Sequence, residues 1–266
     1  MLLHVGYILN DQVKKAINLF QRTKNPDDIL HIIFFNACAQ IASKEILPVM
    51  ENVSKKIRKS FYQNKAMLIS MITAFMKCHD VQQAESIFEQ TKNPSIEMTN
   101  AMMKGYIANN EAKKAIDLFQ KAEDPDSILY NLFFSACAQV GSKEIVSMME
   151  NIWKKIPEEF HHNKYILAST INAFMRHHLV ERAEAIFKQT ENPPIDMINA
   201  MMKGKIVTLF YIDGFIFSFN SMKVILRTIK PRKRLIWFKK RIILMKFILF
   251  YSSKHALRSN LMKFYQ

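Results

Sequence analysis

Histidines and cysteines are the residues of this 266-residue chain that could bind a metal or carry acid–base chemistry. Two adjacent pairs, His161-His162 and His177-His178, suggest a metal site. Neighbouring side chains on a helix point about 100° apart, however, so neither pair presents two ligands to one ion. The sequence also repeats at an offset of 99 residues, and there the equivalent positions hold Tyr62-Gln63 and Cys78-His79. No ligand set recurs, and we predict surface histidines without a metal.

The cysteines and glycines exclude further kinds of site. The three cysteines form no C-x-x-C pair, which excludes a disulfide framework and a cysteine zinc site and points to a reducing compartment. Cys38 and Cys137 lie between alanines and are predicted to be small core residues. Five glycines include no phosphate-binding loop motif. With no other catalytic constellation, we predict a protein that is not an enzyme, has no catalytic residue and needs no cofactor.

Positive charge is concentrated at one end of the chain. The formal net charge is +15, which is typical of nucleic-acid-binding proteins. Residues 1–204 carry 24 basic against 22 acidic residues, whereas residues 205–266 carry 14 basic residues and one acid, Asp213. An argument from bulk charge to nucleic acid therefore applies to the tail and says little about the body.

The elements that position these residues follow from an internal repeat. Residues 7–105 and 106–204 match at 57 of 99 positions without a gap. Within each copy, apolar residues recur at helical spacing, and Pro-containing turns such as Asn25-Pro26-Asp27 and Asp124-Pro125-Asp126 separate them. The 99-residue unit divides into three helix–turn–helix motifs of roughly 31–37 residues. Such motifs bury their apolar faces only by stacking, so we predict an all-α solenoid with a concave inner surface.

Particular motifs identify the family that this rhythm resembles. Asn100-Ala-Met-Met-Lys-Gly-Tyr106, followed by Lys114–Phe119 and Pro125-Asp126, resembles a pentatricopeptide repeat. The segment 134–141 resembles the long variant of that repeat, and 171–187 the short variant. The order resembles the P-L-S subclass, which implies a right-handed α-solenoid. The expected motifs are partial P 1–27, L 28–64, S 65–95, P 96–126, L 127–163, S 164–194 and partial P 195–204.

The resemblance implies that the chain binds single-stranded RNA, with about one base read per motif. In this family the reading pair lies near the start of the first helix and at the last residue of a motif. The pairs expected here are Asn100 with Asp126, associated with uracil, and Asn131 with Asn163, associated with pyrimidines; Asn199 opens a motif that lacks its partner. An amide both donates and accepts hydrogen bonds, so it can pair with these base edges.

Three motifs depart from this pattern. They place Ile32 with Asn64, Ile69 with Ser95, and Ala168 with Pro194 at the reading positions, so we expect loose, pyrimidine-leaning selectivity. Basic residues recur at Lys14/Lys113, Lys15/Lys114 and Lys104/Lys203. They form either a row that lines an RNA groove or a solvated outer face, and the sequence leaves both open.

The family also suggests a cellular role. Many members of this subclass end in a deaminase-like domain with H-x-E and C-x-x-C zinc motifs, and neither motif occurs here. The resemblance implies organelle RNA processing or modification by a monomer, with a mitochondrial location, although no targeting signal is visible. The competing interpretations are a scaffold that binds a protein partner on its concave face, and a non-functional fragment of a larger repeat protein.

The repeat stops abruptly at Gly204. Residues 205–266 are basic and apolar, and three interpretations are open: sequence that is not genuinely coding, a membrane-surface segment, or a basic arm that contacts RNA phosphate. The apolar stretch 206–219 is shorter than the ~20 residues needed to span a bilayer. Membrane contact is therefore expected only through this tail.

Overall fold

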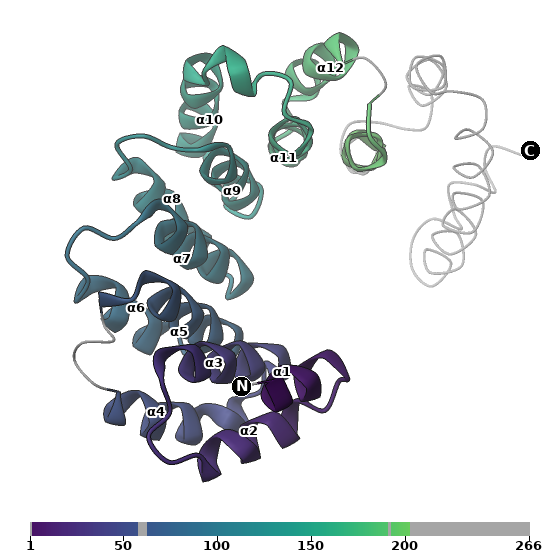
Figure 1. The fold of residues 1–266 in the computed structure, drawn as a ribbon. Coiled ribbons are helices and arrows are strands. Elements are labelled where there is room, and N and C mark those ends of the chain that lie inside the picture. The colour runs from purple at the N-terminus through teal and green to yellow at the C-terminus, as the bar shows by residue number, and fades with distance from the viewer. Residues whose placement is uncertain (1, 58–62, 191–192, 203–266) are drawn as a thin grey trace, which may run out of the picture.

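The computed structural model describes residues 2–57, 63–190 and 193–202, and within these ranges helices alternate with short turns and no strand occurs (Figure 1). The helices are α1 (Leu2–Leu9), α2 (Val13–Arg22), α3 (Asp28–Ile41), η1 (Lys44–Ile46), α4 (Leu47–Lys56), α5 (Lys65–Lys77), α6 (Val81–Glu89), α7 (Ile96–Ala108), α8 (Ala112–Gln120), α9 (Ser127–Cys137), α10 (Lys143–Lys155), η3 (Glu158–Phe160), α11 (Lys164–Arg176) and α12 (Val180–Gln189). A further helix covers 195–202. The prediction of an all-α fold is confirmed.

The helices form hairpins that stack into a curved solenoid. In Figure 1 the first helices of the hairpins, α3, α5, α7, α9 and α11, line the inner side of the arc, and the second helices, α4, α6, α8, α10 and α12, form the outer side. Each first helix packs against the next one along the chain. The concave surface is therefore built from first helices, and the two edges of the solenoid are built from helix ends.

Polar caps set where most of the first helices begin. The side chains of Asp27, Asn64, Asp126 and Asn163 accept hydrogen bonds from backbone N–H groups in the first turns of α3, α5, α9 and α11. Such caps satisfy donors that have no partner within the helix, and each typically contributes about 1 kcal/mol. Each of these caps is also the last residue of a predicted motif, so a single side chain both starts a helix and occupies a predicted reading position.

Short turns in a left-handed backbone conformation close the P and S hairpins. Asp11, His79, Asn110 and His178 have positive φ and sit in the middle of the three-residue turns after α1, α5, α7 and α11. Asn and Asp tolerate this conformation better than most residues. The second residue of the His177-His178 pair is thus a turn residue, as its counterpart His79 is.

The core runs between successive first helices. In the predicted long motifs the core is mostly phenylalanine: Phe133 and Phe134 pack edge to face with ring centroids 5.1 Å apart. At α7 the core is mostly methionine, including Met102 and Met103. Cys38 and Cys137 are fully buried, in agreement with the prediction that they are small core residues. Burial raises the pKa of both thiols above the ordinary value of 9.0.

Gly105 allows the closest approach in this stack. It lies on α7 against α5, where an added Cβ would come within 2.8 Å of the Met76 Cβ. The same glycine–lysine–methionine segment recurs at 201–204, and its last residues lie outside the described ranges. The predictions for residues 205–266 also lie outside them. No helix in the described part of the chain is long and apolar enough to cross a bilayer.

Candidate nucleic-acid interface

The structure brings Asn100 and Asp126 together. Asn100 is the fifth residue of α7, and Asp126 caps the next first helix, α9. The Asn100 Nδ2 donates to the Asp126 Oδ2 at 3.2 Å, while the Asp126 Oδ1 accepts from the Leu129 N–H at 2.7 Å. The cap fixes the carboxylate, and the carboxylate in turn orients the amide. A pair 26 residues apart in sequence therefore acts as one polar unit at the edge of the solenoid.

This contact leaves one acceptor without a partner. The Asn100 Oδ1 is buried and accepts no hydrogen bond from any described residue. An unsatisfied buried acceptor costs about 1–3 kcal/mol, and any donor that reaches it recovers part of that cost. The side chain as a whole is only half-buried. This oxygen is suited to accept from an N–H group on a base edge.

The second predicted pair is arranged differently. Asn131 is the fifth residue of α9 and is half-buried. Asn163 caps α11: its Oδ1 accepts from the Tyr165 N–H at 3.0 Å and the Ile166 N–H at 3.4 Å. Within the described ranges no hydrogen bond joins Asn131 to Asn163. Asn199 is the fifth residue of the 195–202 helix and is half-buried, and the end of its motif lies outside the described residues.

The remaining motifs present apolar or already bonded groups at these positions. Ile32, Ile69 and Ala168 occupy the fifth positions of α3, α5 and α11. Asn64 uses its Oδ1 to cap α5 and donates from Nδ2 to the Asp28 Oδ2 at 2.8 Å. That these motifs contribute little hydrogen-bonded discrimination between bases stays a prediction.

Exposed apolar side chains lie beside the reading positions, and sequence reasoning missed them. Ile29, Ile128 and Tyr165 are the second residues of α3, α9 and α11, and their exposed fractions are 48%, 53% and 62%. The Lys164 Nζ lies 5.1 Å from the centre of the Tyr165 ring. Apolar and aromatic surfaces of this kind can stack bases without discriminating among them. The recurrence of Ile29 as Ile128 at the 99-residue offset was the available signal.

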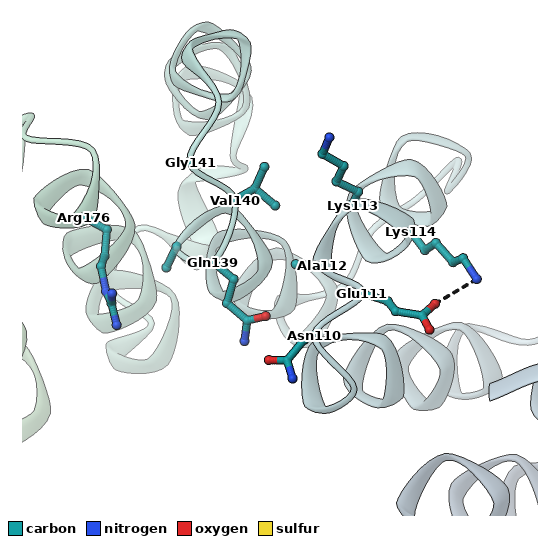
Figure 2. Close-up of a pocket in the computed structure, with 10 residues that line it drawn as sticks. Asn110, Glu111, Ala112, Lys113, Lys114, Gln139, Val140, Gly141 and Arg176 are labelled. Carbon is teal, nitrogen blue, oxygen red and sulfur yellow. Dashed lines mark ion pairs between the residues drawn. The ribbon is translucent and has the colours of Figure 1, made fainter. Parts of the chain in front are cut away.

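A polar pocket of about 790 Å³ lies at the opposite edge, where the hairpin turns meet (Figure 2). The turn after α7, the start of α8, the turn after α9 and the end of α11 line it. Lys113 and Arg176 are exposed cations here, and neither forms an ion pair with another described residue. Gln139 lies between them. The pocket presents net positive charge at a distance from the reading positions.

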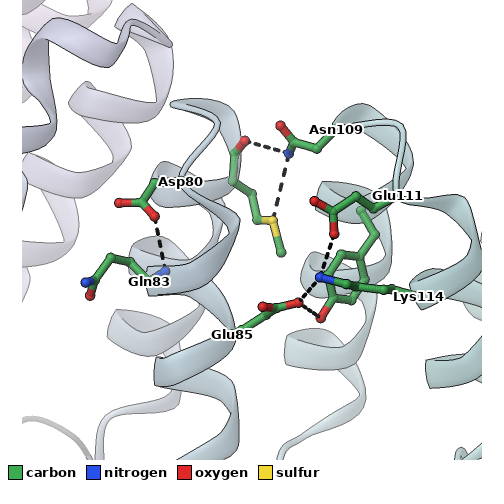
Figure 3. A network of polar contacts seen from close by, with 8 residues as sticks. Asp80, Gln83, Glu85, Asn109, Glu111 and Lys114 are labelled. Carbon is green, nitrogen blue, oxygen red and sulfur yellow. Dashed lines mark hydrogen bonds and ion pairs between the residues drawn. The ribbon is translucent and has the colours of Figure 1, made fainter.

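The sequence suggested a row of lysines, and ion pairs involve only some of its members. The Lys114 Nζ lies 2.8 Å from both the Glu85 Oε1 and the Glu111 Oε2, and the Tyr106 hydroxyl donates to Glu85 at 2.9 Å (Figure 3). Hydrogen bonds to Glu111 and Glu85 raise the pKa of Lys114. Lys114 therefore links neighbouring repeats, whereas Lys104 and Lys113 remain exposed, and Lys203 lies outside the described residues.

The histidines take structural roles. The His177 Nε2 lies 2.8 Å from the Cys137 carbonyl oxygen, and the His79 Nδ1 lies 2.6 Å from the Asn109 Oδ1, so both imidazoles bridge neighbouring repeats. The His161 ring stacks on Trp153 with a centroid distance of 6.0 Å. Among the described residues no three His, Cys, Asp or Glu side chains come together as a metal site would require.

Comparisons with known proteins identify the repeats. The family model of the PPR (pentatricopeptide) repeat matches residues 67–93 and 97–124, which contain α5–α6 and α7–α8. A pentatricopeptide repeat-containing protein of Arabidopsis thaliana is 24% identical over 75% of the chain and 24% of its own length. A chloroplastic relative from the same plant is 25% identical over 59% of the chain and 23% of its own length. A mitochondrial one is 24% identical over 54% of the chain and 22% of its own length.

These relatives are much longer proteins, and the chain spans about a quarter of their length. Their similarity extends beyond the two repeats matched by the family model, in keeping with the continuous stack of hairpins. The curved stack of helical hairpins agrees with the same assignment. The chain thus contains pentatricopeptide repeats at residues 67–93 and 97–124 and is similar over much of its length to pentatricopeptide repeat-containing proteins.

Proposed function

We propose that this chain is a non-catalytic, single-stranded RNA-binding module of the P-L-S subclass that acts in organelle RNA processing. The observation that carries the proposal is the contact between Asn100 and Asp126. The family's reading positions were assigned to these residues from sequence, and their side chains meet at the edge of the solenoid. If Asp126 served only to cap α9, it would not need the contact with Asn100.

The chemistry of this pair favours uracil. Because Nδ2 of Asn100 donates to the carboxylate, its Oδ1 is the group left for a base. Uracil presents an N–H donor at the centre of its pairing edge, whereas the ring nitrogen of cytosine at that place is an acceptor. Reading one base through a few side chains of each repeat is the general mode of helical-repeat RNA binders. Asn131 and Asn163 are proposed to contact a pyrimidine in the next motif.

Selectivity across the chain is proposed to be loose. The other complete motifs offer Ile32, Ile69 or Ala168, which discriminate poorly because they form no side-chain hydrogen bond. Ile29, Ile128 and Tyr165 supply exposed surface that accepts a base of either class by stacking. The expected target is a short segment in which one or two pyrimidine positions matter.

An organellar location is part of the proposal. Of the relatives above, one is named chloroplastic and one mitochondrial. We infer that this chain also acts in an organelle, with the mitochondrion as the first expectation. The free cysteines and their buried positions suit a reducing interior.

Fluorescence anisotropy of the full chain with labelled oligo-uridine and oligo-adenosine tests the proposal. The measured quantity is the ratio of the two dissociation constants, because charge-based contacts with phosphate carry no sequence information and are expected to contribute similarly to both. Asn100→Ala should lower the uridine preference about two- to tenfold, the range expected for one net hydrogen bond. Asn18→Ala makes the same change on an exposed face of α2 and should leave the ratio unchanged.

A parent chain that shows equal affinity for uridine and adenosine would refute base reading by this pair. Asp126→Asn keeps an oxygen that can cap α9 but removes the charge that orients the Asn100 amide, so it should also reduce the preference. Retention of the full preference in both variants would remove the contact from the proposed site and assign the preference to other residues.

A further inference from the structure

A row of cations follows the outer side of the edge at which the reading positions lie. It consists of basic residues in the last turn or at the C-cap of the second helices. The members of this rim row are Arg22 (α2), Lys55 and Lys56 (α4), Lys121 (α8), Lys154 and Lys155 (α10) and Lys188 (α12). The row is interrupted at α6, which ends in Glu89 and is followed by Lys92.

The rim row is largely free of counter-charges. All seven side chains are exposed, and among the described residues only Lys188 has an ion-pair partner, Glu184 at 3.9 Å. A cation at a helix C-terminus interacts favourably with the helix dipole, typically by 0.3–1 kcal/mol. The second lysine on α4 and on α10 also adds repulsion between neighbours, which offsets part of that gain.

The fold places this row next to the reading positions. Short turns join α1 to α2, α5 to α6, α7 to α8 and α11 to α12, which pack as antiparallel hairpins, so these second helices end at the edge where first helices begin. The chain after α4 and α10 leads to the starts of α5 and α11 at the same edge. Lys121 at the end of α8 precedes the cap Asp126 by five residues, and Lys155 precedes the cap Asn163 by eight. Lys113 and Arg176 lie at the opposite edge, one helix length away. The rim row therefore lies at the same edge as Asp126, while the exposed Lys104 lies one helical turn from Asn100 on α7.

The periodicity of the row matches a nucleic-acid backbone. The lysine pair on α4 recurs on α10 at the 99-residue offset, and most second helices contribute one or two cations at the same place. A polynucleotide carries one phosphate charge per nucleotide at regular spacing, and one base per motif places a phosphate at each repeat. An acidic peptide would need acidic residues in matching register to fit the same ladder.

We propose that the rim row binds the phosphate backbone of the single-stranded RNA whose bases are read at the caps. This inference rests on the proposed function and adds the path of the strand: the bases turn toward the first helices and the phosphates lie along the ends of the second helices. Phosphate contacts set affinity and position, and base contacts set sequence preference. The weak net charge of residues 1–204 is then no obstacle, because the free charge is placed along one edge.

The salt dependence of binding tests this path. Anisotropy titrations of the full chain with oligo-uridine, over a range of salt concentrations, give the slope of log affinity against log salt. Each phosphate contact on a single strand contributes about 0.7 to that slope. Replacing Lys55, Lys56, Lys154 and Lys155 with glutamine should lower the slope by up to about 2.8, with about half of that for either pair alone. Glutamine keeps helix propensity, and circular dichroism checks the fold.

The matched control removes free cations from the opposite edge. Lys113→Gln with Arg176→Gln should leave the slope unchanged, and arginine at the four rim positions should restore the parent slope. The uridine preference over adenosine should persist in the rim variants, because phosphate contacts carry no sequence information.

An unchanged slope in the rim variants, or an equal fall in the control, would overturn the proposed path while leaving base reading intact. The proposed function fails separately, if the parent shows no uridine preference. Lysine-dependent binding to polyglutamate with no effect on the RNA slope would assign the row to an acidic protein and also overturn the inference.

Discussion

Thr170 is the clearest place where this fold carries an unmet polar group. It lies in the middle of α11 with no exposed surface, and its Oγ1 has no hydrogen-bond partner among the described residues. The equivalent position in the first copy of the repeat holds Met71, which is also buried. Thr170→Val removes the hydroxyl and keeps the shape of the side chain. We expect the variant to be more stable than the parent.

The size of the gain follows from the desolvation cost. A buried hydroxyl without a partner costs about 1–3 kcal/mol relative to an apolar group of the same shape. For a domain of about 200 residues, 1 kcal/mol corresponds to a shift in Tm of about 2–4 °C. Because repeat arrays unfold in segments, hydrogen exchange of the α11 amides localises the effect better than a global melt. Protection of these amides should rise by about 1–3 kcal/mol.

Thr190→Val is the matched control. The Thr190 hydroxyl donates to the Ile186 carbonyl at 2.9 Å, so the same substitution removes a made hydrogen bond at the end of α12. It should destabilise the protein by about 0.5–1.5 kcal/mol. If Thr170→Val is neutral or destabilising while the control behaves as stated, the hydroxyl has a partner in solution and the reasoning from burial is wrong.

Two further perturbations test the packing of the repeats. Gly105→Ala should destabilise the α5–α7 contact by about 1–2 kcal/mol, because overpacking against Met76 exceeds the gain in helix propensity. Urea denaturation measures the loss, and the same substitution should cost less in a Met76→Ala background, where the clash is absent. Burial raises the pKa of Cys137 above its ordinary 9.0, so the native state holds the neutral thiol, and the stability linked to it is present below about pH 9 and lost as the pH rises above it. Urea titrations from pH 8 to 10 should show this fall, and Cys137→Ala should reduce it, with the buried Cys38 contributing the remainder in the same direction; an equal fall in the variant would contradict the assignment.

Much of the fold could be predicted because the repeat encodes it locally. Helical spacing of apolar residues and turns such as Asp124-Pro125-Asp126 place each hairpin, and stacking is the only way for short hairpins to bury their apolar faces. The cap residues were recognisable for the same reason, since Asp126 and Asn163 act on helices that begin at the next residue. Features that depend on residues within one hairpin were within reach of the sequence.

Features that depend on the contact between two neighbouring repeats could not be predicted in this way. The hydrogen bond between Asn100 and Asp126 requires the distance and rotation between α7 and α9, which side-chain periodicity does not specify. The exposure of Ile29 and Ile128 was missed for a related reason: an apolar residue in a helix start is assigned to the core unless the position of the preceding repeat is known. The interface of a solenoid forms between units, so its chemistry is visible only once the units are stacked.

Lys113 and Lys114 show why the charge count was a poor guide to function. They are adjacent in sequence, and a helix separates neighbouring side chains by about 100°. Lys114 turns toward the preceding repeat and is neutralised by Glu85 and Glu111, whereas Lys113 faces the pocket without an ion-pair partner among the described residues. A net charge near zero over 1–204 thus combines paired charges that hold repeats together with free charges gathered at the edges. Affinity for a polyanion depends on the second group alone, since a paired lysine gives up its ion pair when it meets a phosphate.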